Sequence, residues 1–122
     1  MKKNNVIIAM YEVLDCLYEE ELESDKIHLF LSDLNPYVWK NRMTADPAIQ
    51  AQFYRYSKDQ FNGDDVDPNL AYEIAKGFLH EQSEYYSTIF PNDKSVPFDE
   101  MFSEIDLAEW NDLCKIIEQE ES

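Results

Sequence analysis

The run from Asp67 to Pro91 constrains the fold more than any other part of the sequence. Asp67 is a favourable helix N-cap, Pro68 suits the first helical position, and Pro91 blocks further extension. At about 3.6 residues per turn, the apolar residues between them share one half of the helix surface. They are Leu70, Ala71, Ile74, Ala75, Phe78, Leu79, Tyr85, Tyr86 and Ile89. The sequence therefore predicts a long helix that neighbouring elements must cover.

Gly77 lies inside this predicted helix, at the margin of its apolar face. Glycine at such a position costs about 1 kcal/mol relative to alanine. Either another helix or a ligand approaches closely there, or the glycine is simply tolerated.

The other regular segments are also predicted to be helices. They run from about Asn4 or Asn5 to Glu23, from Lys26 to Leu34, from Pro47 to about Phe61, from Pro97 or Phe98 to about Glu104, and from Leu107 to Ile117. The apolar run Ile27–Leu31 also fits a short buried strand, but no second strand is available to pair with it. Asp106 and Glu109 have the spacing of a capping box. We expect an all-α fold, a compact bundle of about five to six helices around the central helix near residues 68–90, with a frayed acidic tail at 118–122.

The length of 122 residues and the apolar content of 44% fit one domain, residues 1–122, with a single core. The apolar run Val6–Met10 is too short to span a bilayer. Glu12 and Asp15 interrupt the apolar segment that continues beyond it, which is atypical of a signal peptide. Cys16 and Cys114 are too few for a disulfide framework. We expect a cytoplasmic protein with reduced thiols.

The formal net charge of −16 bears most directly on function. It argues against nucleic acids and anionic membrane surfaces as partners, because phosphate binding needs a basic patch. The same charge favours attraction to a basic protein. The alternative interpretation is that the acidic residues only keep the protein soluble.

Catalytic and metal-binding signatures are incomplete. Gly63 and Gly77 cannot form a glycine-rich phosphate loop or a nucleophile elbow. His80 lacks the second histidine of a zincin helix, and His28 lacks the second carboxylate–histidine motif of a di-iron bundle. Cys16 lies among acidic residues, which disfavour its reactive thiolate. The acidic loop 62–67 does not follow the EF-hand pattern. We therefore expect no enzyme activity, no cofactor and no metal.

Candidate partner contacts come from several parts of the chain. The loop from Asn35 to Asp46 either lays Trp39 on the core as a lid or presents Tyr37, Trp39 and Arg42 outward, and these residue types are common at interface hot spots. The run Glu19–Glu21 lies near a predicted helix end where the macrodipole disfavours anions. The further candidates are Glu19, Glu20, Glu21, Tyr54, Phe61, Asp64, Asp65, Asp99 and Glu100.

Together these features favour a small acidic protein-interaction domain. Its most concrete version is an immunity- or antitoxin-like inhibitor that covers a basic partner protein, such as a nuclease toxin, with carboxylates in place of phosphates. The alternative is a regulatory or scaffold subunit that acts through an apolar groove or a homodimer face, with Tyr54 and Phe61 as contacts. A small enzyme or metal protein is the least favoured hypothesis.

Overall fold

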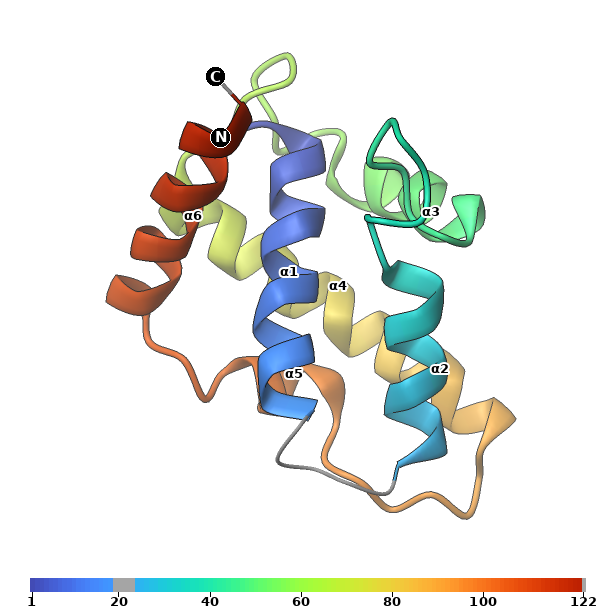
Figure 1. The fold of residues 1–122 in the computed structure, drawn as a ribbon. Helices are drawn as coiled ribbons and strands as arrows, with labels where there is room; N and C mark the ends of the chain where they lie inside the picture. Colours follow the sequence, from blue (N-terminus) through green and yellow to red (C-terminus); the bar gives the residue numbers. More distant parts are fainter. Residues whose placement is uncertain (19–23, 122) are drawn as a thin grey trace.

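A computed structural model describes residues 1–18 and 24–121. Within them the chain forms six helices: α1 (Lys3–Tyr18), α2 (Asp25–Leu34), α3 (Pro47–Ser57), α4 (Pro68–Ile89), α5 (Phe98–Phe102) and α6 (Leu107–Glu121). The described residues form no strand, only isolated bridges that join Asp65 to Lys2 and to Asn62. The predicted all-α bundle is confirmed (Figure 1). None of the described helices combines the length and the apolar character needed to cross a membrane.

Helix α4 is the centre of the bundle, as its sequence pattern predicts. It contacts each of the other five described helices, and Figure 1 shows it passing behind α1 and α2. Asp67 caps its first turn by accepting a hydrogen bond of 2.8 Å from the Asn69 backbone N–H. The buried part of its apolar face consists of Ala71, Tyr72, Ile74, Ala75, Phe78, Leu79 and Tyr86. Leu70, Tyr85 and Ile89 were expected on the same face but are exposed.

Gly77 marks the closest approach between α3 and α4. A methyl group built on Gly77 would overlap the hydroxyl oxygen of Tyr56 and lie 3.2 Å from the ring carbon that carries it. The Tyr56 ring also packs against Phe78, with the two ring centroids 5.8 Å apart. Of the two alternatives for this glycine, close approach of another helix is therefore correct.

Two predicted helix boundaries differ from the structure. Helix α3 ends at Ser57 rather than near Phe61, and a turn follows in which the Gln60 N–H donates to the Ser57 carbonyl at 2.9 Å. Helix α6 continues to Glu121, so residues 118–121 are helical rather than frayed. Glu118 stabilises this end by accepting a hydrogen bond of 2.6 Å from the Asn5 side chain. The expected end of the first helix at Glu23 lies outside the described residues.

The segment Ile27–Leu31 is helical, as favoured above, and Ser24 caps α2. Asp93, in the loop after α4, strengthens this cap from outside the helix. Its carboxylate accepts hydrogen bonds from the Ser24 hydroxyl at 2.9 Å and from the Lys26 backbone N–H at 3.1 Å. Burial alone would raise the pKa of Asp93, but the hydrogen bonds that it accepts, first from Ser95 and then from Lys26 and Ser24, hold that pKa well below its usual range.

Candidate functional site

The segment 35–46, called here the aromatic loop, connects α2 to α3 and projects from the bundle (Figure 1). Its two ends are joined by backbone hydrogen bonds. The Ala45 N–H donates to the Asn35 carbonyl at 2.9 Å, and the Asp46 N–H donates to the Asp33 carbonyl at 2.9 Å. Such a closed base is typical of a compact surface loop whose ends lie side by side. The loop is therefore held in place by the ends of two helices.

Three successive large side chains of the aromatic loop face solvent. Tyr37 is 47% exposed, Val38 56% and Trp39 50%. The interpretation of Trp39 as a lid on the core is therefore wrong, and the outward presentation is correct. The Trp39 indole N–H donates to the Ala45 carbonyl at 3.3 Å, which fixes the ring against the base of the loop. An apolar groove beside it is lined by Trp39, Lys40, Asn41, Met43 and Pro47.

Tyr37 joins the aromatic loop to α1. Its hydroxyl donates to the Glu12 carboxylate, its ring meets Tyr11 edge-on with centroids 5.8 Å apart, and the Arg42 guanidinium lies 5.3 Å from its centroid. Partial burial, together with the hydrogen bond to Glu12, raises the pKa of Tyr37 well above its usual range. The phenol therefore stays protonated and keeps donating at neutral pH.

Arg42 is the described non-glycine residue with a left-handed backbone, at φ 62°. A conformation of this kind is strained for a residue with a side chain, and it persists only where the surroundings impose it. Here the Arg42 N–H donates to the Trp39 carbonyl at 3.2 Å, and the guanidinium lies over the Tyr37 ring. These two contacts hold Arg42 against the other two aromatic-loop residues predicted as contacts, Tyr37 and Trp39.

The acidic candidates do not gather with the aromatic loop. Asp64 and Asp65 lie in the loop before α4, where Asp65 approaches the N-terminal ammonium group at 3.9 Å. Asp99 and Glu100 belong to α5, and the Asp99 carboxylate lies 3.4 Å from His80. The prediction for Glu19, Glu20 and Glu21 lies outside the described residues. The carboxylates near Tyr37 and Tyr11 are instead Glu12 and Asp15 on α1, together with Glu120 on α6.

Tyr54 and Phe61 do not form an exposed pair. Phe61 is only 9% exposed and meets Phe53 edge-on in the core, because the chain turns inward after α3. Tyr54 is half-buried, with its hydroxyl bonded to Asn4 on α1. The expected exposure of Phe61 is therefore wrong, whereas a contact of the half-buried Tyr54 with a partner or a second copy stays a prediction.

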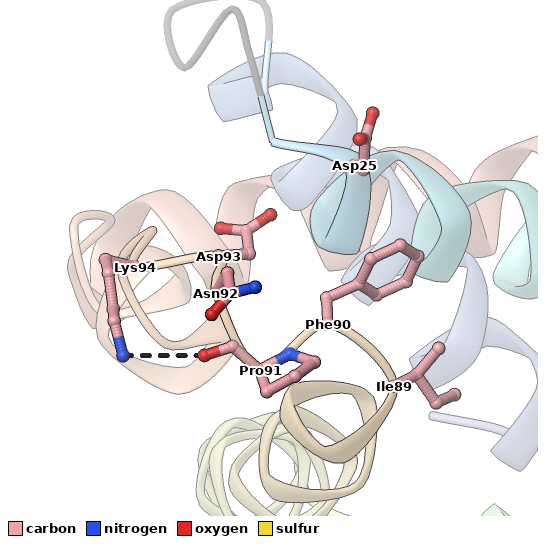
Figure 2. A pocket seen from close by; sticks show the side chains of 7 residues that line it. All are labelled: Asp25, Ile89, Phe90, Pro91, Asn92, Asp93 and Lys94. Atoms are coloured by element: carbon pink, nitrogen blue, oxygen red, sulfur yellow. Dashed lines mark hydrogen bonds between the residues drawn. The ribbon is translucent and has the colours of Figure 1, made fainter.

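A hollow of about 540 Å³ beside the start of α2 is shown in Figure 2. Asp25, Asp93 and Lys94 are the charged residues at its edge, and the last two are already engaged within the protein. Asp93 binds the start of α2, and the Lys94 ammonium donates to the Pro91 carbonyl at 3.4 Å, on the side of the hollow away from Ile89. This hollow therefore offers less to a ligand than its size suggests.

The reactive side chains found in the sequence stay apart. Cys16 is exposed and Cys114 is buried, and both are free thiols. His80 lies on the surface, with Nε2 3.0 Å from the Glu84 carboxylate, as the helical spacing predicts. Among residues 1–18 and 24–121, no group of three or more His, Cys, Asp or Glu side chains is arranged to hold a metal ion.

Sequence reasoning missed a second group of exposed residues next to the aromatic loop. Tyr85 and Ile89 were expected to be buried, but they are 59% and 45% exposed and line a pocket together with Asp33 and Asp46. Asp46 was recognised only as a helix cap, and no local pattern distinguishes Asp33.

The chain matches no protein-family model, no curated protein and no solved structure.

Proposed function

We propose that this protein is a small acidic interaction domain that binds a basic protein partner through the aromatic loop and the carboxylates beside it. The most concrete form is an immunity- or antitoxin-like inhibitor of a cationic effector such as a nuclease. The observation that carries the proposal is the exposure of Tyr37, Val38 and Trp39 on a loop whose ends are hydrogen-bonded together.

Preorganisation makes these side chains effective anchors. Tryptophan and tyrosine dominate interface hot spots, and truncating such a residue costs about 2 kcal/mol or more of binding free energy. The bond from Tyr37 to Glu12 and the bond from Trp39 to Ala45 hold the two rings before any partner arrives. Binding then loses less side-chain entropy than it would with mobile rings.

Charge supplies the second part of the proposal. The chain has 26 acidic residues against 10 lysines and arginines, so a basic protein is attracted over a longer range than any direct contact. Glu12 places a carboxylate against the anchor Tyr37, and Asp15 lies near the neighbouring ring of Tyr11. In an inhibitor, such carboxylates would occupy the positions at which a nuclease binds the phosphates of its substrate.

Affinity capture from a lysate of the source cells tests this function. The wild-type protein is expected to retain a basic protein at low ionic strength and to release it as salt is raised, because screening weakens the attraction. Trp39→Ala is expected to weaken the affinity by about thirtyfold, which corresponds to about 2 kcal/mol. For a captured nuclease, a stoichiometric amount of the protein is expected to stop cleavage.

Leu70→Ala is the matched control, because Leu70 is a comparably exposed apolar residue, 41% exposed, at the other end of α4. It should capture the partner as well as the wild type does. The proposal is wrong if no basic protein is retained, if retention ignores ionic strength, or if both substitutions have the same effect. Circular dichroism of each variant checks that the helices are intact.

A further inference from the structure

A small pocket at the base of the aromatic loop adds a specific contact to this surface. It has a volume of about 150 Å³ and lies between α2, α3 and α4. Its polar lining consists of Asp33, Asp46, Gln52 and Gln82, and its outer edge includes Tyr85 and Ile89. Ligand and cofactor sites are usually about 300–1,000 Å³, so this pocket suits one protruding side chain better than a whole small molecule.

The lining of the pocket is anionic, because it contains two carboxylates. Asp33 comes from α2 and Asp46 from the cap of α3, and none of the described residues that line the pocket is basic. The Asp46 N–H donates to the Asp33 carbonyl at 2.9 Å, which keeps the two residues adjacent although they lie in different elements. Two neighbouring carboxylates in a partly enclosed space favour a cationic occupant.

Each carboxylate is oriented through one of its oxygens. The Tyr86 hydroxyl donates to Asp33 Oδ2 at 2.7 Å, and the Ala48 N–H donates to Asp46 Oδ1 at 3.0 Å. A carboxylate has two acceptor oxygens, so these bonds fix its direction while leaving acceptor capacity for a ligand. The Gln82 side chain is also fixed, because its amide nitrogen donates to Gln52 Oε1 at 2.8 Å.

Helix α4 adds to the preference for a cation. Tyr86 and Ile89 belong to its last turn, where the helix dipole places a partial negative charge. That turn contains no basic residue to balance the charge. Tyr85 also offers an exposed aromatic ring, and such a ring attracts a guanidinium group placed over its face.

We propose that this pocket receives an arginine side chain of the basic partner. The inference depends on the proposed function and names one contact within it. Arginine fits better than lysine because its planar guanidinium has five N–H donors that can bond two carboxylates together and stack on Tyr85. Pro47 lines the groove beside Trp39, while its chain neighbours Asp46 and Ala48 line the pocket. The arginine would therefore sit next to the tryptophan anchor.

The pocket can be tested without the partner. The ¹⁵N-labelled protein is titrated by NMR with N-acetyl-arginine amide, with the neutral citrulline analogue and with N-acetyl-lysine amide. We expect the arginine probe to shift the amide signals of Ala48 and Ile49, the citrulline probe to leave them unchanged, and the lysine probe to bind more weakly. Equal shifts with citrulline, equal or tighter binding of lysine, or shifts confined to other residues would overturn the proposal.

Conservative variants sharpen the test. Asp33→Asn and Asp46→Asn keep a hydrogen-bond acceptor for Tyr86 and a good N-cap for α3, so both should fold while binding the arginine probe about tenfold more weakly. Asp67→Asn is the matched control, because Asp67 caps α4 as Asp46 caps α3 but does not line the pocket. Unchanged binding in the first two variants, or equal loss in all three, contradicts the inference.

The two proposals fail separately. Capture of a basic partner that depends on Trp39 but not on Asp33 or Asp46 would leave the proposed function standing and refute the arginine pocket. Binding of the arginine probe that needs both carboxylates, without capture of any basic protein, would support the pocket and refute the proposed function.

Discussion

Replacing Gly77 by alanine tests the contact between α3 and α4. Alanine favours a helix by about 1 kcal/mol over glycine. The new methyl group would, however, overlap the Tyr56 hydroxyl and lie 3.2 Å from the adjoining ring carbon, and overpacking of this kind costs about 1–3 kcal/mol. An overpacking cost of about 2 kcal/mol exceeds the gain in helix propensity of about 1 kcal/mol. Gly77→Ala is therefore expected to lower the free energy of unfolding by about 1 kcal/mol, as measured by urea denaturation.

The Tyr56→Phe background separates the two effects. It removes the overlapping oxygen but keeps the ring, so Gly77→Ala should then raise the free energy of unfolding by about 0.5 kcal/mol. The resulting coupling energy of about 1.5 kcal/mol between the two substitutions is within the range measured for residues in contact. Tyr72→Phe is the control background, because the Tyr72 hydroxyl bonds to the Ile105 carbonyl and should show no coupling. Stabilisation by Gly77→Ala in the wild type, or the same effect in all backgrounds, would refute the reasoning.

Three further predictions concern single side chains. The pKa of Asp93 is lowered in the folded state, so the ionised carboxylate stabilises the fold. This stabilisation is complete above the pKa of about 3.9 in the unfolded chain and is lost as the pH falls below that value. Asp93→Asn should lower the unfolding free energy by about 1–2 kcal/mol near neutral pH and reduce the loss of stability at about pH 3, both measured by urea denaturation. Burial, and then the charge of Glu118, raise the pKa of the Cys114 thiol to about 12, so iodoacetamide should alkylate only Cys16 in the native protein, and mass spectrometry of Cys16→Ser should show no label. Asp106→Ala should lower the stability by about 1 kcal/mol, because Asp106 accepts the Glu109 N–H at 2.8 Å in the cap of α6. The thermal midpoint should fall accordingly, and an unchanged midpoint contradicts this.

Local patterns account for most of the fold. The Asp-Pro starts of α3 and α4 are read directly from adjacent residues, and both aspartates form the expected cap bonds. The capping box before α6 is also confirmed, with Glu109 Oε1 accepting the Asp106 N–H at 3.3 Å. Such signals involve residues within one turn, so the sequence carries them without reference to the rest of the molecule.

The candidate site was less predictable because it depends on distant parts of the chain. Periodicity placed Tyr85 and Ile89 on the apolar face of α4, but it does not show how far neighbouring helices cover that face. The sequence leaves open whether Trp39 covers the core or faces outward, and hydrogen bonds between the ends of α2 and α3 hold its loop outward. Asp33 and Asp46 meet only because those helix ends meet, and no spacing rule connects them.

The closed base of the aromatic loop separates substitutions in the loop from the packing of the helices. Segment 35–46 leaves the scaffold and returns to it at neighbouring points, at which Asn35 pairs with Ala45. Substitutions at its outer positions therefore need no compensating change among the buried residues of α1 and α4. Binding specificity can therefore change through substitutions in the aromatic loop, while the residues of the helical interior stay the same.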